Sequence, residues 1–221
     1  ASSQSRRSFP GGEANHCSKF IIGLDISFER IFDNLTPMQL TALPAMADNY
    51  IWMLHNGSEA VVCDPGEAGP AIDALRRQGL ALAAILVTHR HADHIGGVNT
   101  LYRQCGNPDT QVYLPAADGL ADSTFSAVPA RALQRCSHGD ALQILGLQVV
   151  VLDVPGHTAG HIAYFAERQS GLEQPFVLCG DTLFSAGCGR IFEGTPLQMY
   201  ASLQKLAALP DETRVCCAHE Y

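Results

Sequence analysis

The sequence has 221 residues, of which 47% are hydrophobic and 16% are charged, so one domain can bury a sizeable core. Its formal net charge of -8 argues against nucleic-acid binding, which requires a basic surface. No run of 18 apolar residues occurs, so a membrane-spanning helix is not expected. The eight cysteines form no C-x-x-C pair, and several lie in apolar runs. They are interpreted as buried free thiols of a cytoplasmic protein.

Residues 1–37 differ from the rest of the chain. The first eight residues are rich in serine and arginine, and the stretch that follows shows no periodicity of apolar residues. We expect this part to be a weakly ordered extension, or translated upstream sequence, outside the folded domain. The domain itself is expected to span residues 38–221.

From residue 38 onward the pattern predicts strands that alternate with helices. In chain order these are strands over 39–43, 50–54 and 60–63, a helix over 70–78, a strand over 83–87, a helix over 98–104, strands over 111–114, 147–154, 162–166 and 176–178, a helix over 197–209 and a strand over 214–217. Asn56-Gly57 is typical of a hairpin turn, and Gly79 of a helix end. Strands in pairs with helices at intervals indicate two packed sheets with helices outside.

A cluster of metal-binding residue types follows directly after the strand expected over 83–87. It consists of His89, His91, Asp93 and His94. In an extended segment His89 and His91 point the same way, because they are two residues apart. Asp93 and His94 can then turn to another side, so the segment can supply ligands to two sites. Imidazole and carboxylate are ligands that zinc and similar divalent cations accept.

Three further candidate ligands each follow a predicted strand. His157 comes after a Pro-Gly turn, Asp181 comes after Gly180, and His219 comes shortly after the last strand. Loops at strand ends gather functional side chains on a rigid sheet. Together with the first cluster they make seven candidate ligands, enough for two cations if one carboxylate is shared. His161 is interpreted as an exposed or satisfied histidine near a strand.

The segment from Thr88 to His94 resembles the T-H-x-H-x-D-H signature of the metallo-β-lactamase superfamily. Segments 180–184, 187–190 and 192–195, with 48–50 and 219–221, resemble the glyoxalase II family within it. The resemblance implies an α/β fold, the four-layer αββα sandwich, with two divalent metal ions at one edge. The ligands that it implies are His89, His91 and His157 for the first metal, Asp93, His94 and His219 for the second, and Asp181 as a bridge.

The same resemblance implies an activity, which is hydrolysis of the thioester S-(2-hydroxyacyl)glutathione, chiefly S-lactoylglutathione. The products would be glutathione and a 2-hydroxy acid, D-lactate, as in methylglyoxal detoxification. Two cations, zinc by expectation with iron or manganese as alternatives, would hold a bridging hydroxide beside the catalytic carboxylates Asp93 and Asp181. Arg190, Phe192 and Tyr221 would contact the glutathione moiety. A monomeric cytoplasmic enzyme is expected.

Two features depart from the glyoxalase II pattern. Phe192 stands where the family often has tyrosine, which removes one hydroxyl contact. Glyoxalase II enzymes continue beyond the H-E-Y motif into a C-terminal helical domain, which this sequence lacks, so a fragment of a longer protein is expected. Two alternatives therefore remain: an enzyme like persulfide dioxygenase with a single iron, which shares the T-H-x-H-A-D-H and G-C-G-R segments, and a metal-binding domain with impaired turnover. The segment 192–195 favours the thioesterase.

Overall fold

A computed structural model of the chain describes residues 37–220, which fall within one compact unit. Residues 1–36 of the extension expected over 1–37, and the expected substrate contact of Tyr221, lie outside these described residues. Among residues 37–220, no helix is long and apolar enough to cross a membrane.

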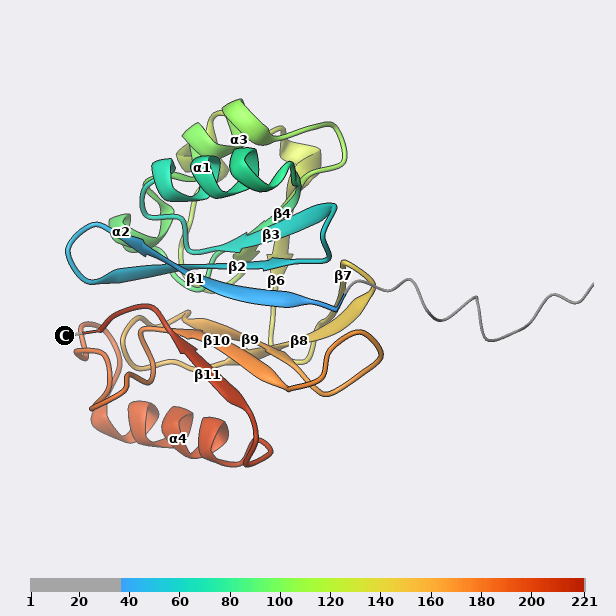
Figure 1. The fold of residues 1–221 in the computed structure, drawn as a ribbon. Coiled ribbons are helices and arrows are strands. Elements are labelled where there is room, and N and C mark those ends of the chain that lie inside the picture. The colour runs from blue at the N-terminus through green and yellow to red at the C-terminus, as the bar shows by residue number, and fades with distance from the viewer. Residues whose placement is uncertain (1–36, 221) are drawn as a thin grey trace, which may run out of the picture. The chain divides into compact units, whose positions relative to one another are not determined.

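Two mixed β-sheets lie face to face, and helices cover their outer faces (Figure 1). The first sheet has the order β1-β2-β3-β4-β5-β6, and the second has the order β11-β10-β9-β8-β7. The strands are β1 (Gln39–Ala45), β2 (Asn49–His55), β3 (Glu59–Cys63), β4 (Ala81–Leu86), β5 (Gln111–Pro115), β6 (Leu133–Cys136), β7 (Ala141–Ile144), β8 (Leu147–Asp153), β9 (Ile162–Ala166), β10 (Phe176–Gly180) and β11 (Arg214–Cys217). The helices are α1 (Gly69–Gln78), α2 (Ala92–Ile95), α3 (Val98–Cys105) and α4 (Pro196–Ala207). The expected αββα sandwich is confirmed.

Three buried apolar clusters fill the three spaces between the four layers. Alternation along β2 assigns Ile51 to the cluster under α1 and α3, and Trp52 to the cluster between the sheets. Tyr164 on β9 is fully buried in that same middle cluster, and the third cluster joins Val177 on β10 to Leu206 on α4. Because both faces of the central strands are covered, those strands read as continuous apolar runs.

The predicted strands and helices are all present, with ends shifted by a few residues. Asn56-Gly57 does lie in the turn between the antiparallel strands β2 and β3, and Gly57 has φ 90°. The helix α4 begins at a capping box made by Thr195 and Gln198, and it ends at Ala207 rather than at residue 209. Strands β6 and β7 and the single turn α2 were not predicted.

Candidate metal centre

The seven predicted ligands come together at one edge of the sandwich, from loops that follow strands of both sheets. In the first sheet β3, β4, β5 and β6 run parallel, and His89 and His91 follow β4. In the second sheet β8, β10 and β11 run in one direction, because β9 is antiparallel to both β8 and β10. His157, Asp181 and His219 follow these three strands in turn. Loops beyond the carboxyl ends of such strands form binding crevices in α/β proteins.

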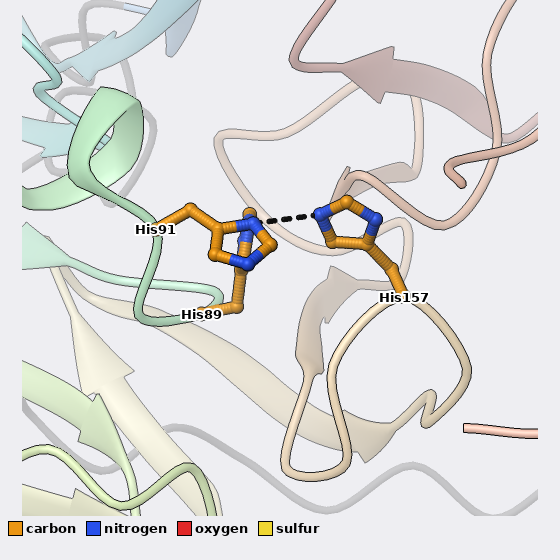
Figure 2. Close-up of side chains that lie close together, drawn as sticks. All are labelled: His89, His91 and His157. Carbon is orange, nitrogen blue, oxygen red and sulfur yellow. Dashed lines mark hydrogen bonds between the residues drawn. The ribbon is translucent and has the colours of Figure 1, made fainter. Parts of the chain in front are cut away.

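The first donor group consists of three imidazoles. Nε2 of His89 lies 3.0 Å from Nδ1 of His91, and Nε2 of His157 lies 2.9 Å from the same atom. Figure 2 shows the rings of His91 and His157 pointing toward each other, with His89 beside them. One ligand atom from each of the three lies within 4.8 Å of the others. His89 and His157 are buried, whereas His91 is partly exposed at the entrance.

The second donor group consists of Asp93, His94 and His219, whose ligand atoms also lie within 4.8 Å of one another. Oδ2 of Asp93 is 3.5 Å from Nε2 of His94 and 3.3 Å from Nε2 of His219. Asp93 and His94 lie in the helical turn α2, and the ring of His94 also lies 4.0 Å, centroid to centroid, from that of His89. The segment 89–94 thus contributes residues to both donor groups.

Asp181 lies between the two groups and presents one oxygen to each. Its Oδ2 is 3.2 Å from Nε2 of His157 in the first group. Its Oδ1 is 3.4 Å from Nε2 of His94 and 3.3 Å from Nε2 of His219 in the second group. A carboxylate placed in this way can ligate two cations at once.

The donor set fits divalent cations. Among residues 37–220, the buried atoms His94 Nε2 and Asp181 Oδ1 have no hydrogen-bond partner, and they lie 3.4 Å from each other. Buried polar atoms in native proteins are nearly always paired, so two such atoms that face each other require a partner the protein does not supply. Imidazole nitrogens and carboxylate oxygens are donors that a divalent cation accepts, so the residues present fit such a partner.

The charge states of the site suit a cation as well. The neighbouring imidazoles of His219 and His94 hold the pKa of Asp93 well below its usual range. Burial raises the pKa of Asp181, but the same two imidazoles outweigh burial and leave that pKa low. Burial and the neighbouring imidazoles lower the pKa of His89, so its ring is neutral. Burial also lowers the pKa of His219, but hydrogen bonds to Asp181 and Asp93 raise it to about 10. A bound cation would take the place of such protons.

Partners behind the ligands orient their rings. Nδ1 of His157 donates to the backbone oxygen of Arg190 at 2.7 Å, and Nδ1 of His219 donates to Oδ1 of Asp48 at 3.3 Å. Each bond leaves Nε2 directed into the site, as ligating histidines require. In the sequence, Asp48 is part of a segment that resembles the family, and no role was predicted for it.

His161 was interpreted as an exposed or satisfied histidine, and it is not exposed. It is buried, and its Nε2 accepts a hydrogen bond from the backbone N–H of Asp181 at 3.1 Å. Its ring stacks on His89 with centroids 4.6 Å apart, and its Nδ1 has no hydrogen-bond partner among residues 37–220. Burial lowers its pKa to about 3, so it is neutral. Its position four residues after His157 was the available signal.

Two of the three predicted substrate contacts lie at the entrance to the first donor group. The ring of Phe192 is 57% exposed and meets His91 and His157 edge to face, at centroid distances of 5.4 and 5.3 Å. The guanidinium of Arg190 lies 5.1 Å from the centroid of Phe192. Arg90 and Glu193 form an ion pair beside them.

Comparison with known proteins agrees with this geometry. The model of the metallo-β-lactamase superfamily matches residues 48–219. A hydroxyacylglutathione hydrolase of Albidiferax ferrireducens is 54% identical over 184 residues, which is 83% of this chain and 67% of that protein. The chain belongs to the hydroxyacylglutathione hydrolase family of the metallo-β-lactamase superfamily.

Other relatives agree with this membership. A hydroxyacylglutathione hydrolase of Pectobacterium carotovorum is 48% identical over 83% of this chain and 66% of that protein. The chain thus spans about two thirds of the length of these hydrolases. Among solved structures, the BLEG-1 B3 metallo-β-lactamase has a TM-score of 0.67 at 28% identity, covering 83% of this chain and 92% of that one.

Proposed function

We propose that this chain hydrolyses thioesters of glutathione with 2-hydroxy acids, chiefly S-lactoylglutathione, to glutathione and the free acid. The observation that carries the proposal is Asp181, whose two carboxylate oxygens face two separate groups of metal-binding side chains. Identity of 54% to a hydroxyacylglutathione hydrolase supports the choice of substrate class. The single-iron alternative would use fewer protein ligands, and would leave the convergence of Asp93, His94 and His219 unexplained.

Two divalent cations, zinc as first choice, would be held by the residues described above. The first would take His89, His91 and His157, the second Asp93, His94 and His219, and Asp181 would serve both. When bound, such a pair lowers the pKa of water from 15.7 to about 7 and polarises the carbonyl that is attacked.

The chain's own residues supply the rest. Asp93 is held by Asn49, which donates to its Oδ2 at 3.3 Å, and its partial exposure lets it orient the attacking water. Phe192 covers the rings of His91 and His157 and keeps bulk water from the thioester. No strong general acid is needed, because a thiol of pKa about 8.5 leaves readily as the thiolate.

Binding of the glutathione moiety is assigned to Arg190 and to the exposed ring of Phe192, with Tyr221 as a third contact. Arg190 is exposed and lies beside Phe192, so its guanidinium is available to a substrate carboxylate. An arginine presents two N–H groups in a planar fork that matches a carboxylate.

The test is an assay of the purified 221-residue chain, reconstituted with zinc, against S-lactoylglutathione, with the released thiol measured by a chromogenic reagent. His157→Ala should abolish release. His138→Ala should not, because His138 is exposed and its ring contacts Asp153, outside the centre. A wild-type chain that binds two zinc ions but releases no thiol contradicts the proposal. Oxygen uptake with glutathione persulfide would instead support the mononuclear alternative.

A further inference from the structure

A buried carboxylate outside the seven candidate ligands lies behind the metal centre. Asp64 follows β3, is only 5% exposed and has φ 51°. This left-handed conformation is uncommon for residues other than glycine, and it persists where surrounding contacts impose it. Here the backbone N–H of Asp64 donates to Leu86 O at 2.9 Å, and its carbonyl accepts from Gly66 N–H at 2.8 Å. The strained backbone therefore holds the carboxylate in one place.

The two oxygens of Asp64 accept three hydrogen bonds. Oδ1 accepts the backbone N–H of Thr88 at 2.8 Å. Oδ2 accepts the hydroxyl of Thr88 at 2.6 Å and Nδ1–H of His94 at 3.1 Å. An ionised carboxylate can only accept, so both of the partners at Oδ2 must donate their protons to it.

Thr88 links Asp64 to a second histidine of the site, His89. Its Oγ1 lies 3.1 Å from Nδ1 of His89. A hydroxyl has one proton, and that of Thr88 is given to Asp64, so the contact forms only if Nδ1 of His89 donates. Oδ2 of Asp64 thus requires a proton on Nδ1 of both histidines, directly for His94 and through the hydroxyl of Thr88 for His89.

A proton on Nδ1 leaves Nε2 as the ligating nitrogen. Nε2 of His89 faces His91 in the first donor group, and Nε2 of His94 faces Asp93 and Asp181 in the second. We infer that Asp64 is a positioning residue that sets the ring tautomer of one ligand in each metal site, directly for His94 and through Thr88 for His89. This inference rests on the proposed dinuclear centre and adds that the two sites share one support.

The geometry argues against Asp64 as a ligand itself, although Asp64, His89 and His94 also have ligand atoms within 4.8 Å of one another. Its contacts are to the Nδ1 side of the His94 ring, opposite the Nε2 atom that faces Asp181. Its oxygens already accept donors from Thr88 and His94.

The deciding variant is Asp64→Asn, which keeps the shape of the side chain but replaces one acceptor with an NH2 donor. If the NH2 group takes the place of Oδ1, it faces the backbone N–H of Thr88. If it takes the place of Oδ2, it faces the hydroxyl of Thr88 and Nδ1–H of His94. Both zinc affinities, measured by competition with a chelator, should weaken about 10- to 100-fold, the range typical of lost outer partners of metal ligands. Thr88→Val should weaken one zinc site and leave the other, and Thr88→Ser should restore it.

Asp118→Asn is the matched control. Asp118 is equally buried, but the hydrogen bonds that it accepts come from the backbone N–H groups of Arg90 and Gly160 and not from a ring. Nitrogen-15 spectra of histidine rings in the zinc-loaded protein should show Nδ1–H for His89 and His94 in wild type and in Asp118→Asn, and should lose the His94 signal in Asp64→Asn.

Unchanged zinc affinities in Asp64→Asn, or weakened affinities with both Nδ1–H signals intact, would overturn the inference. If Asp64→Asn does not fold, the pair Thr88→Val and Thr88→Ser decides the question alone: equal zinc binding in the two variants overturns it. A wild-type chain that does not bind two zinc ions refutes the dinuclear centre itself, which is a separate failure.

Discussion

Two glycines pack against the backbone of the carboxylate ligands, and their replacement gives a sharp test of the site. A Cβ added at Gly66 would lie 1.8 Å from the backbone oxygen of Asp93, and one added at Gly189 would lie 2.0 Å from that of Asp181. Real Cβ atoms essentially never approach closer than 3.0 Å. Alanine at either position therefore moves a ligand backbone, or the segment that carries the new methyl group, by about 1 Å.

The expected cost follows from that displacement. A misplacement of about 1 Å in a catalytic constellation can reduce the rate about 100-fold, which corresponds to about 2.7 kcal/mol in the activation barrier. Gly66→Ala and Gly189→Ala should each lower kcat/KM for S-lactoylglutathione by about this factor. Zinc affinity should weaken in parallel, because the displaced residue is a ligand in each case.

Gly69→Ala is the matched control, since its added Cβ meets no atom within 4 Å and the residue opens α1 on the exposed side. Thermal unfolding of the metal-free variants separates damage to the site from damage to the fold. If Gly66→Ala and Gly189→Ala keep the kcat/KM and the zinc affinity of Gly69→Ala, the placement of the two carboxylates is wrong.

Three other outcomes are expected. Asp181→Asn should lower the zinc content from two equivalents to one or fewer by elemental analysis, because an amide cannot bridge as a carboxylate does, and retention of two would contradict the shared ligand. Arg190→Ala should raise KM several-fold with little change in kcat, since an exposed guanidinium binds ground and transition states alike, and steady-state kinetics with an unchanged KM would exclude the contact. At pH 8 an alkylating reagent should label exposed Cys188 quickly by peptide mass mapping, whereas Cys136 and Cys216, whose pKa values burial raises to about 11 and about 12, should react only after unfolding. Fast labelling of either buried cysteine in the native protein would count against the described core.

The elements that could be predicted are those with strong local signals. The strands β2 and β3 are apolar runs joined by Asn56-Gly57, and the helix α1 ends at Gly79 in the left-handed region. By contrast, β6 and β7 are four residues long, and each contains polar side chains. They are strands because β6 pairs with β5 and β7 pairs with β8. Such pairing depends on the tertiary structure, so the local sequence does not predict it.

The site divides in a similar way. The ligand positions were predictable because three of the nine histidines of this chain, His89, His91 and His94, fall within six residues. The supporting residues were not, because Asp64 followed by Pro-Gly has the composition of an ordinary turn. What distinguishes Asp64 is its hydrogen bonds to Thr88 and His94, 24 and 30 residues away.

The direction of the strands indicates where residues that support the metal ligands can lie. In the first sheet β3, β4 and β5 are parallel neighbours, so their carboxyl ends meet at one edge. Asp64 follows β3 and Thr88 follows β4, and their side chains contact the rings of His94 and His89. An acidic or hydroxyl side chain in the first few residues after a buried parallel strand is therefore a candidate support, even where its local sequence indicates only a turn. The direction of the strands determines where the metal site and its outer partners lie, and the sequence of the loops determines which chemical groups are found there.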